Sequence, residues 1–430
     1  MRSNRHLRRS CFLHGQVILS AIVLLVSLAQ AQYQFQVLHN FAGGSDGTSP
    51  SGSLLLGGHG ALYGATAGGG AYGNGTAFLL TPGNDGWTEG ILHSFNFYTD
   101  GDTPLAPLAL DASGNVYGVT GAGGPQDLGT VYELSPSGDE WTLSLMYGSG
   151  SRVGLTSDGS GSLYGFLGSG AYQAGAIANL FSAGNDWVYS QLYSFCGQPH
   201  CQEGERAAAP LSWDAKGNLY GTTFWGGYPP PQCPQGLGCG VAFELVHNQP
   251  SDSVSSAASW TYHVMHRFGS FPDDGQSPNG GVVVDGKGNV YGTTTAGGGG
   301  CGSPGCGTVF MLSRTAAAPW FWKETILYNF PATPVCSQGC VPAYNLLMDK
   351  AGNLYGIAGG GSLACVDSCG LIFKLSPHPN GKWSYSIVHE FQKQDGAYPN
   401  GLAMDANGNL FGTTEAGGTY NLGVVYEVTP

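Results

Sequence analysis

The 430-residue sequence is poor in charge, and especially in basic residues. Only 10% of its residues are charged, with 15 Lys and Arg against 28 Asp and Glu, for a net charge of -13. A chain this acidic repels nucleic acid and anionic lipid headgroups, so neither is an expected partner. The sequence also lacks a Gly-x-Ser-x-Gly elbow, a His-Glu-x-x-His zinc motif and a Walker box. We therefore expect no cofactor and no metal, and favour a protein that is not an enzyme.

Long apolar runs are scarce beyond the amino-terminal segment. There, four Arg between residues 2 and 9 precede the apolar residues 17–28 and the A-x-A site at 29–31. This order predicts a signal peptide over residues 1–31, with a mature chain from residue 32. The apolar run is short for a membrane span, which needs about 20 residues, although an uncleaved anchor remains the alternative. Removing four Arg leaves 11 basic and 28 acidic residues, a mature charge of -17.

Helical periodicity is equally scarce in the mature chain. The 73 Gly and 24 Pro together fall below the level typical of disorder, and 12% aromatic residues indicate a packed core. Runs of β-branched and aromatic residues, punctuated by glycine, dominate instead. We expect an exported all-β protein, extracellular, periplasmic or at the cell surface, with residues 32–430 as one monomeric domain.

The cysteine count fits an exported chain. Cys11 leaves with the signal peptide, and the other ten cysteines form five local pairs. An even number in an oxidising compartment predicts disulfides, each worth roughly 2 kcal/mol for such short loops. A zinc site would need two pairs to converge or nearby His ligands. The predicted disulfides are Cys196 with Cys201, Cys233 with Cys239, Cys301 with Cys306, Cys336 with Cys340, and Cys365 with Cys369.

A five-residue box recurs seven times. Clear copies are Gly217-Asn218-Leu219-Tyr220-Gly221 and residues 352–356 and 408–412, and Tyr63, Tyr117, Tyr164 and Tyr291 mark the others. The aromatic positions are 54, 47, 56, 71, 64 and 56 residues apart, which indicates a tandem array. Each unit contains a strand, an Asp-x-x-Gly hairpin, a second strand, a Gly-rich loop and a third strand.

A fourth strand in most units begins with Trp and ends eight residues later in Phe, as in Trp87 to Phe95. Period-2 alternation predicts that Trp87, Ile91 and Phe95 share one face. The seventh unit lacks this strand, but residues 33–41 have the same spacing and can supply it. This arrangement predicts a seven-bladed β-propeller with four strands per blade, closed by the amino-terminal strand. A β-helix is the second interpretation.

The repeat resembles the GloVer tandem-repeat family of exported bacterial proteins. The resemblance rests on Asp-x-x-Gly-Asn-Leu-Tyr-Gly-Thr-Thr, the following Gly-Gly loop, Gly-Thr-Val-Phe-x-Leu and Trp-x-x-x-x-Leu-Tyr-x-Phe, over residues 33–430. It implies the propeller fold but no defined activity. Members often carry a carboxy-terminal sorting segment; this sequence ends at Pro430 without one, so release is expected rather than anchoring.

Residues repeated in most units are expected to be scaffold. The box tyrosines and His39, His93, His266 and His389 are therefore interpreted as packing positions, since Tyr replaces His at the same place in other units. The Asp-Gly pairs that precede the first strands are interpreted as turns, with calcium binding as the alternative. The Gly-rich loops open no helix and so do not suggest a phosphate site.

The fourth unit departs most from the repeat. Unrepeated aromatic residues there lie beside the densest charge cluster, in loops carrying predicted disulfides. The candidate ligand-binding residues are Phe224, Trp225, Tyr228, Glu203, Glu205 and Arg206. The leading hypothesis is a secreted, non-catalytic protein that binds an extracellular glycan or protein on this face; the aromatic residues could instead fill a hydrophobic gap. The alternatives are a polysaccharide lyase or glycoside hydrolase with a site in the central cleft, and a structural envelope or matrix protein.

Overall fold

A computed structural model describes most of the chain beyond residue 32. The described residues are 33–148, 153–184, 186–227, 233, 237–248, 259–271, 273–299, 305–315, 318–331, 336–360 and 369–430. Within them, Tyr33–Pro430 forms one compact unit, and no helix is long and apolar enough to cross a membrane. The predicted signal peptide, Tyr228, Cys301 and Cys365 lie outside the described residues.

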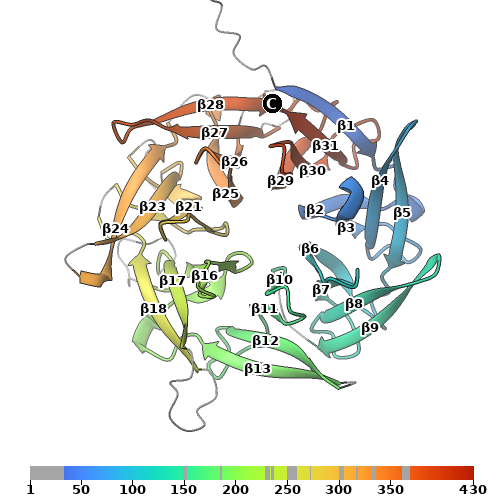
Figure 1. Cartoon of the computed structure of the whole chain (residues 1–430), viewed down its shortest axis with the longest axis horizontal. Coiled ribbons are helices and arrows are strands. Elements are labelled where there is room, and N and C mark those ends of the chain that lie inside the picture. Colours follow the sequence, from blue (N-terminus) through green and yellow to red (C-terminus); the bar gives the residue numbers. More distant parts are fainter. Residues whose placement is uncertain are drawn as a thin grey trace, which may run out of the picture. The chain divides into compact units, whose positions relative to one another are not determined.

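The described strands build seven antiparallel blades arranged in a ring (Figure 1). Blades 1 to 3 comprise β2 (Thr48–Leu56), β3 (Leu62–Gly68), β4 (Thr76–Gly83) and β5 (Gly86–Ser94); β6 (Asp102–Leu110), β7 (Val116–Ala122), β8 (Thr130–Ser137) and β9 (Glu140–Gly148); and β10 (Thr156–Ser157), β11 (Leu163–Phe166), β12 (Ala176–Ala183) and β13 (Asp186–Ser194).

The innermost strands of blades 4 and 5 are broken into short pieces, while blades 6 and 7 are regular. These four blades comprise β14 (Glu205–Ala207), β15 (Ser212–Trp213), β16 (Leu219–Trp225), β17 (Val241–Asn248) and β18 (Ser259–Arg267); β19 (Gly275–Gln276), β20 (Val283–Val284), β21 (Val290–Thr294), β22 (Ala296–Gly297), β23 (Thr308–Thr315) and β24 (Ala318–Asn329); β25 (Cys340–Met348), β26 (Leu354–Gly359), β27 (Leu371–Pro377) and β28 (Trp383–Glu390); and β29 (Ala397–Met404), β30 (Leu410–Ala416), β31 (Val424–Thr429) and β1 (Gln34–Asn40). Single-turn 3-10 helices, η1 (Gly44–Asp46), η2 (Gly58–Gly60) and η3 (Pro199–Cys201), lie in loops.

The amino-terminal strand closes the ring, as the sequence predicts. Strand β1 pairs with β31 in antiparallel register from Gln34 opposite Thr429 to Asn40 opposite Val424. It becomes the outermost strand of blade 7, so the first and last strands of the compact unit share one sheet (Figure 1). Closure pairs two strand edges that would otherwise stay free. It also excludes the β-helix interpretation.

The hydrophobic core of the described residues lies between blades, in seven clusters that each join two neighbours. Between blades 7 and 1, for example, Phe41, Leu54 and Phe78 pack against Phe411. The Phe that ends each fourth strand is fully buried in six blades, at Phe41, Phe95, Phe195, Phe268, Phe330 and Phe391. Each blade therefore depends on its neighbours for its core.

The box glycine makes room for an aromatic ring. Gly221 lies opposite Phe243 in the strand register, and a Cβ at Gly221 would lie 2.6 Å from the Phe243 ring. Five other boxes pair Gly with Phe or Tyr in the same way, which places the ring over the glycine backbone. The exception is Gly165, which faces Ala178. Glycine at this position therefore allows dense packing between the second and third strands.

A β-bulge interrupts each outermost strand and corrects one prediction. In blade 1 the register shifts between Ala77 and Phe78, so Leu92 has no partner of its own. Phe95 and Leu92 are buried, whereas Ile91 is 37% exposed. The expectation that Trp87, Ile91 and Phe95 share one face is therefore wrong, because the extra residue reverses the alternation beyond it.

Candidate functional site

The loops that join blades and the loops between second and third strands contact each other on one face of the ring. We call this the loop face and the opposite face, with the Asp-x-x-Gly hairpins, the hairpin face. Three predicted disulfides form here: Cys196–Cys201 and Cys336–Cys340 between blades, and Cys233–Cys239 between second and third strands. Cys306 and Cys369 are also disulfide-bonded, and their predicted partners, Cys301 and Cys365, lie outside the described residues.

A ring of left-handed backbone positions lies on the loop face. The first strand of six blades is entered through a non-glycine residue with φ between 49° and 59°, and Pro follows in five of them. Pro disfavours that conformation in the residue before it, so each position is strained. Loop contacts hold it in place: the Ser277 N–H donates to the Cys239 carbonyl over 2.8 Å, and the Tyr398 N–H to Cys369 over 2.9 Å. We call these residues the entry ring: Ser49, Thr103, Arg206, Ser277, Val341 and Tyr398.

The centre of the ring contains a cavity of about 310 Å³. All seven blades contribute to its lining, with Ser51, Leu105, Val153, Ala209, Asn279, Asn345 and Asn400 as one representative from each. Each entry-ring residue lies two or three positions before a lining residue in the chain. The one charged side chain among the described lining residues is Glu415, which is exposed. The cavity is thus a small-residue and amide environment without a pair of carboxylates.

The fourth-blade candidates form a local cluster on the loop face. Strand β14 pairs with β16 so that Glu205 lies opposite Trp225. The Arg206 guanidinium lies 4.6 Å from the Trp225 ring centroid and 5.8 Å from that of Phe224, which gives cation–π contacts. Arg206 is exposed and both rings are half-buried. Together these four residues present aromatic surface and charge at the start of one blade.

Glu203 lies apart from that exposed cluster. Its side chain is buried, and Oε1 accepts the Gln198 N–H over 2.7 Å. Its backbone carbonyl accepts the Tyr262 hydroxyl. Glu203-Gly204 occupies the place that Asp-Gly takes in other blades, which explains why its carboxylate binds a backbone amide of its own loop. Glu203 therefore shapes the loop that carries Arg206.

The repeated His and Asp-Gly positions, treated separately in the sequence, are partners in the structure. Their Nε2–carboxylate distances are 2.9 Å for His39–Asp46 and His93–Asp100, 3.2 Å for His266–Asp274 and 3.1 Å for His389–Asp395. Each Asp also accepts a backbone N–H three or four residues earlier, as from Ser270 to Asp274 over 2.7 Å. The Asp-Gly pairs thus act as turns, the interpretation preferred from sequence.

Two of these pairs face a glutamate that sequence reasoning missed. Glu89 on β5 lies 3.8 Å from His39, and Glu324 on β24 lies 3.6 Å from His266, between Nε2 and Oε2. Burial first, and then the neighbouring Asp46 or Asp274 carboxylate, raises the pKa of each Glu to about 9. The equivalent strand positions carry Phe35, Tyr189, Tyr262 and Tyr385. Blade 2 carries Leu143 there, so a glutamate at a position that is otherwise aromatic or aliphatic is the signal in the sequence.

The hairpin face carries a second cavity, of about 470 Å³, between blades 3 and 4. Tyr164, Trp213 and Trp260 line it with His247, and the His247 ring stacks on Trp260 at 4.4 Å. Asp158 and Asp214 contribute carboxylates. Trp213 precedes its Asp-x-x-Gly hairpin where other blades carry Leu, Ser, Val or Met, a departure that the sequence interpretation did not use.

The fold and these loops define a disulfide-stapled, seven-bladed propeller made of one tandem repeat. Residues 22–229 and 253–426 match the Gloeobacter/Verrucomicrobia repeat. The chain belongs to that family, as its resemblance to the GloVer repeat predicted. No curated protein matches the sequence.

Several solved structures have a distant similarity to the chain. A Thermus thermophilus protein assigned as an oxidoreductase (glucose dehydrogenase) shares 14% identity, with 92% of this chain and 99% of that chain covered and a TM-score of 0.42. A luciferin-regenerating enzyme shares 15%, covering 78% and 93%, with a TM-score of 0.42. A Trypanosoma rangeli sialidase in complex with sialic acid shares 9%, covering 92% and 58%, also with a TM-score of 0.42. Neither activity nor ligand transfers to this chain at such similarity.

Proposed function

We propose that this protein is an exported, non-catalytic propeller that binds an extracellular ligand, a glycan or a protein, on its loop face. The observation that carries the proposal is the entry ring. One strained backbone position recurs in six blades, yet its side chains are Ser, Thr, Arg, Ser, Val and Tyr. A repeated backbone that presents varied side chains is suited to recognition, because the scaffold holds the loops in place while their chemistry differs.

The exposed residues of the entry ring supply the chemistry that recognition needs. Tyr398 is 43% exposed and Val341 is 48% exposed, while Arg206 lies over Trp225. Aromatic rings stack on sugar rings or on protein side chains, and guanidinium binds hydroxyls and carboxylates. The disulfides on this face limit loop motion, which lowers the entropy lost on binding. They also fit an oxidising compartment such as the periplasm or the cell exterior.

The geometry favours binding over glycan cleavage. A glycoside hydrolase commonly places two carboxyl groups about 5 to 10 Å apart across the scissile bond. Among the described residues that line the central cavity, Glu415 is the single carboxylate. A structural envelope role would leave the varied entry ring without an explanation.

The test is a binding and cleavage assay on a panel of soluble polysaccharides and extracellular protein fractions. We expect retention of one class in affinity gels, no new sugar ends, and at least about tenfold weaker retention for Trp225→Ala and Tyr398→Ala. Phe321→Ala, at a side chain that is 69% exposed on blade 5, is the matched control. Release of products would overturn the non-catalytic proposal. If retention is lost in Trp213→Ala but not in Trp225→Ala or Tyr398→Ala, the ligand binds on the hairpin face instead of the loop face.

A further inference from the structure

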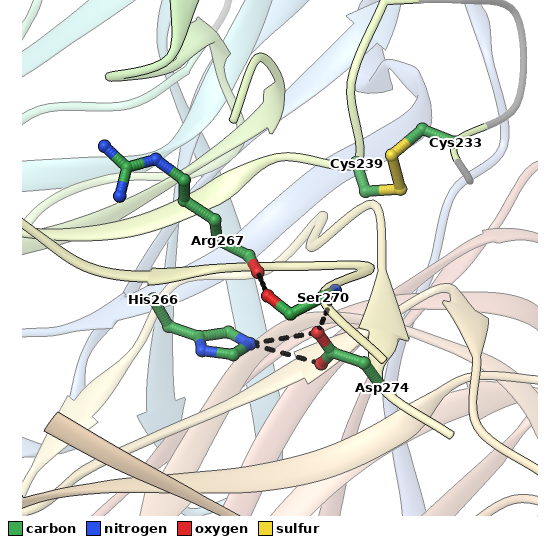
Figure 2. Close-up of a disulfide and its surroundings, with 6 residues drawn as sticks. All are labelled: Cys233, Cys239, His266, Arg267, Ser270 and Asp274. Atoms are coloured by element: carbon green, nitrogen blue, oxygen red, sulfur yellow. Dashed lines mark hydrogen bonds and ion pairs between the residues drawn. A yellow bond between two sulfur atoms is a disulfide. The ribbon is translucent and has the colours of Figure 1, made fainter. Parts of the chain in front are cut away.

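Three side chains that could bind a metal converge between blades 4 and 5. His266 on β18 places Nε2 3.2 Å from both oxygens of Asp274 and 3.6 Å from Glu324 Oε2 on β24. One ligand atom from each residue lies within 4.8 Å of the others. Figure 2 shows His266 facing the Asp274 carboxylate, which also accepts the Ser270 N–H.

Glu324 is the residue that points to a ligand. Its side chain is 3% exposed and that of Asp274 is 0% exposed, so both carboxylates are buried away from solvent. Neither oxygen of Glu324 receives a hydrogen bond, and within the described residues no Lys or Arg pairs with either carboxylate. An unpaired buried carboxylate is costly unless a cation or a proton neutralises it. The two buried carboxylates therefore have no permanently charged partner, and the imidazole of His266 is their one basic neighbour among the described ion pairs.

The spacing of the ligand atoms suits a small ion. Two ligands bound about 2.0 to 2.1 Å from a tetrahedral zinc lie roughly 3.3 Å apart. The separations of 3.2 Å and 3.6 Å at His266 Nε2 are close to this value. Calcium prefers six to eight oxygen ligands and longer bonds, so the imidazole and the small donor number disfavour it. One imidazole and two carboxylates are ligands that zinc accepts, with a fourth position left for water.

We propose that His266, Asp274 and Glu324 bind a zinc ion that links the outer strands of blades 4 and 5. In four other seams the equivalent contact is a stacked ring pair: Tyr147 with Tyr189, Tyr193 with Tyr262, Tyr328 with Tyr385, and His389 with Phe35. Strand register places Glu324 at the position of Tyr189, Tyr262, Tyr385 and Phe35, because each faces the corresponding Leu or Val of its third strand. Zinc replaces ring stacking as the contact across this seam.

The turn that carries Asp274 is held in place by a disulfide. Gly269 has φ +77°, and a Cβ there would lie 2.5 Å from Cys239 Sγ. Figure 2 shows the Cys233–Cys239 bridge. The bridge belongs to the core cluster that joins blades 4 and 5, which also contains Phe268. Two ligands thus come from the ends of one anchored turn and the third from the next blade. Such preorganisation favours binding because little ordering is required.

The seam between blades 7 and 1 repeats the ligand set with His39, Asp46 and Glu89. Its members are more exposed, at 21%, 19% and 14%, and one Glu89 oxygen is buried without a hydrogen bond. Zinc bound at this second seam would increase the number of zinc ions bound per protein. The decisive measurement is therefore the difference in stoichiometry between the protein and a Glu324 variant.

The purified, disulfide-intact protein is first treated with EDTA, and the EDTA is then removed. Zinc chloride is titrated into this protein, and calorimetry measures the number of zinc ions bound. We expect Glu324→Phe to bind one equivalent fewer than the wild type and to show a smaller rise in Tm when zinc is added. Phe already occupies this strand position as Phe35, so the variant is expected to fold; Glu324→Gln keeps the side-chain shape as a second test. Glu390→Gln, an exposed carboxylate on β28, should bind as the wild type does.

Two results would overturn the site. One is equal zinc stoichiometry in the wild type, Glu324→Phe and Glu324→Gln. The other is no binding up to about 100 μM zinc, which would show that a proton alone neutralises Glu324. Zinc-edge X-ray absorption of the loaded protein supplies an independent check. Nitrogen and oxygen neighbours support the assignment, whereas sulfur in the first shell would assign the zinc to reduced cysteines instead.

Discussion

Phe35 and His389 stack face to face, with ring centroids 3.9 Å apart and planes 8° from parallel. Phe35 lies on the first strand of the ring and His389 on the last strand of blade 6. The same Phe35 ring also contacts Phe391 and Tyr426. One side chain near the amino terminus therefore joins blades 6 and 7 in addition to the strand pairing that closes the ring.

Replacement of Phe35 by Ala is expected to destabilise the protein. Removing a fully buried Phe costs about 3 to 5 kcal/mol, and Phe35 is half-buried, so we expect a loss of roughly 2 to 3 kcal/mol. Urea unfolding followed by tryptophan fluorescence measures this loss. Gln36→Ala, at an exposed position on the same strand, is the control. Equal midpoints for the two variants would show that Phe35 does not contribute to closure.

A buried charge on β17 depends on a neighbouring blade. Glu244 is 2% exposed, accepts the Tyr220 hydroxyl over 2.7 Å and forms an ion pair with Arg314 of blade 5. Arg314→Ala would leave this carboxylate without its cation, and we expect a loss of about 2 kcal/mol, less than for a fully buried pair because Arg314 is 38% exposed. Lys323→Ala, an exposed cation on β24, should change the unfolding free energy by less than about 0.5 kcal/mol.

A double variant distinguishes the loss of the ion pair from the loss of packing by Arg314. Arg314→Met combined with Glu244→Leu removes both charges, and this pair should be more stable than Arg314→Ala alone because no buried charge is left unpaired. A double variant as unstable as Arg314→Ala would mean that the loss arises from lost packing of Arg314 on Trp322, whose ring centroid lies 4.4 Å from the guanidinium.

Acid should weaken the hairpin face. Burial would raise the pKa of Asp214, but hydrogen bonds from Asn218, Lys216 and Tyr220 outweigh it and hold the pKa below its ordinary value. The pKa values of Asp111, Asp285 and Asp349 are lowered in the same way. The unfolded carboxyls bind protons first as the pH falls, so the folded state is stabilised above about pH 4 and loses that contribution below it.

Urea midpoints from pH 6 to pH 2 test this linkage. The difference between the wild type and Asp214→Asn should be largest above pH 5 and shrink as the pH falls towards 2 and the carboxyl takes up a proton. Asp186→Asn, at an exposed carboxyl on β13, serves as the control for the substitution itself. A difference for Asp214→Asn that does not change with pH would contradict a lowered pKa at this hairpin.

The disulfides should differ in their accessibility to reductant. Cys233 and Cys239 are 6% and 0% exposed, whereas Cys196 and Cys201 are partly exposed in the loop before blade 4. A thiolate must reach the sulfur that it attacks. Under mild reduction with alkylation and mass spectrometry, we expect Cys196 and Cys201 to be labelled at least about tenfold faster. Equal labelling would indicate that the Cys233–Cys239 loop opens readily.

Much of the fold could be predicted because the repeat makes each signal visible several times. The spacing from Trp to Phe locates the outermost strands, and the same spacing at residues 33–41 predicts closure of the ring. The bulge in those strands is not predictable, because the extra residue is neither Gly nor Pro: in blade 1 it is Leu92, which is aliphatic like its neighbour Ile91. Their exposure depends on which third-strand residue pairs with each, a property of register alone.

The candidate sites were less predictable because they combine residues from different blades. The sequence predicts Trp225 and Arg206 as parts of one site, and the pairing of β14 with β16 brings them into contact. Glu203 is close to them in the sequence, but in the structure its carboxylate accepts the backbone N–H of Gln198. His266 and Glu324 share no sequence motif. They come together because β18 and β24 are the outer strands of neighbouring blades. The hydrogen bond between His and Asp is likewise not predictable from spacing, because it forms only when the loop that joins two blades folds back on the outermost strand.

Pairing of β1 with β31 also sets the order of events during biosynthesis. Strand β1 is made before the other described strands and its partner β31 after them, so β1 has no partner strand until blades 1 to 6 have been made. Blades 1 to 6 contain their own four strands and can form as the chain lengthens. Completion of blade 7 is the long-range step, with the largest loop-closure cost and therefore the slowest expected rate. A chain that terminates before residue 424 would leave both β1 and β30 as open edges, available for pairing with another copy.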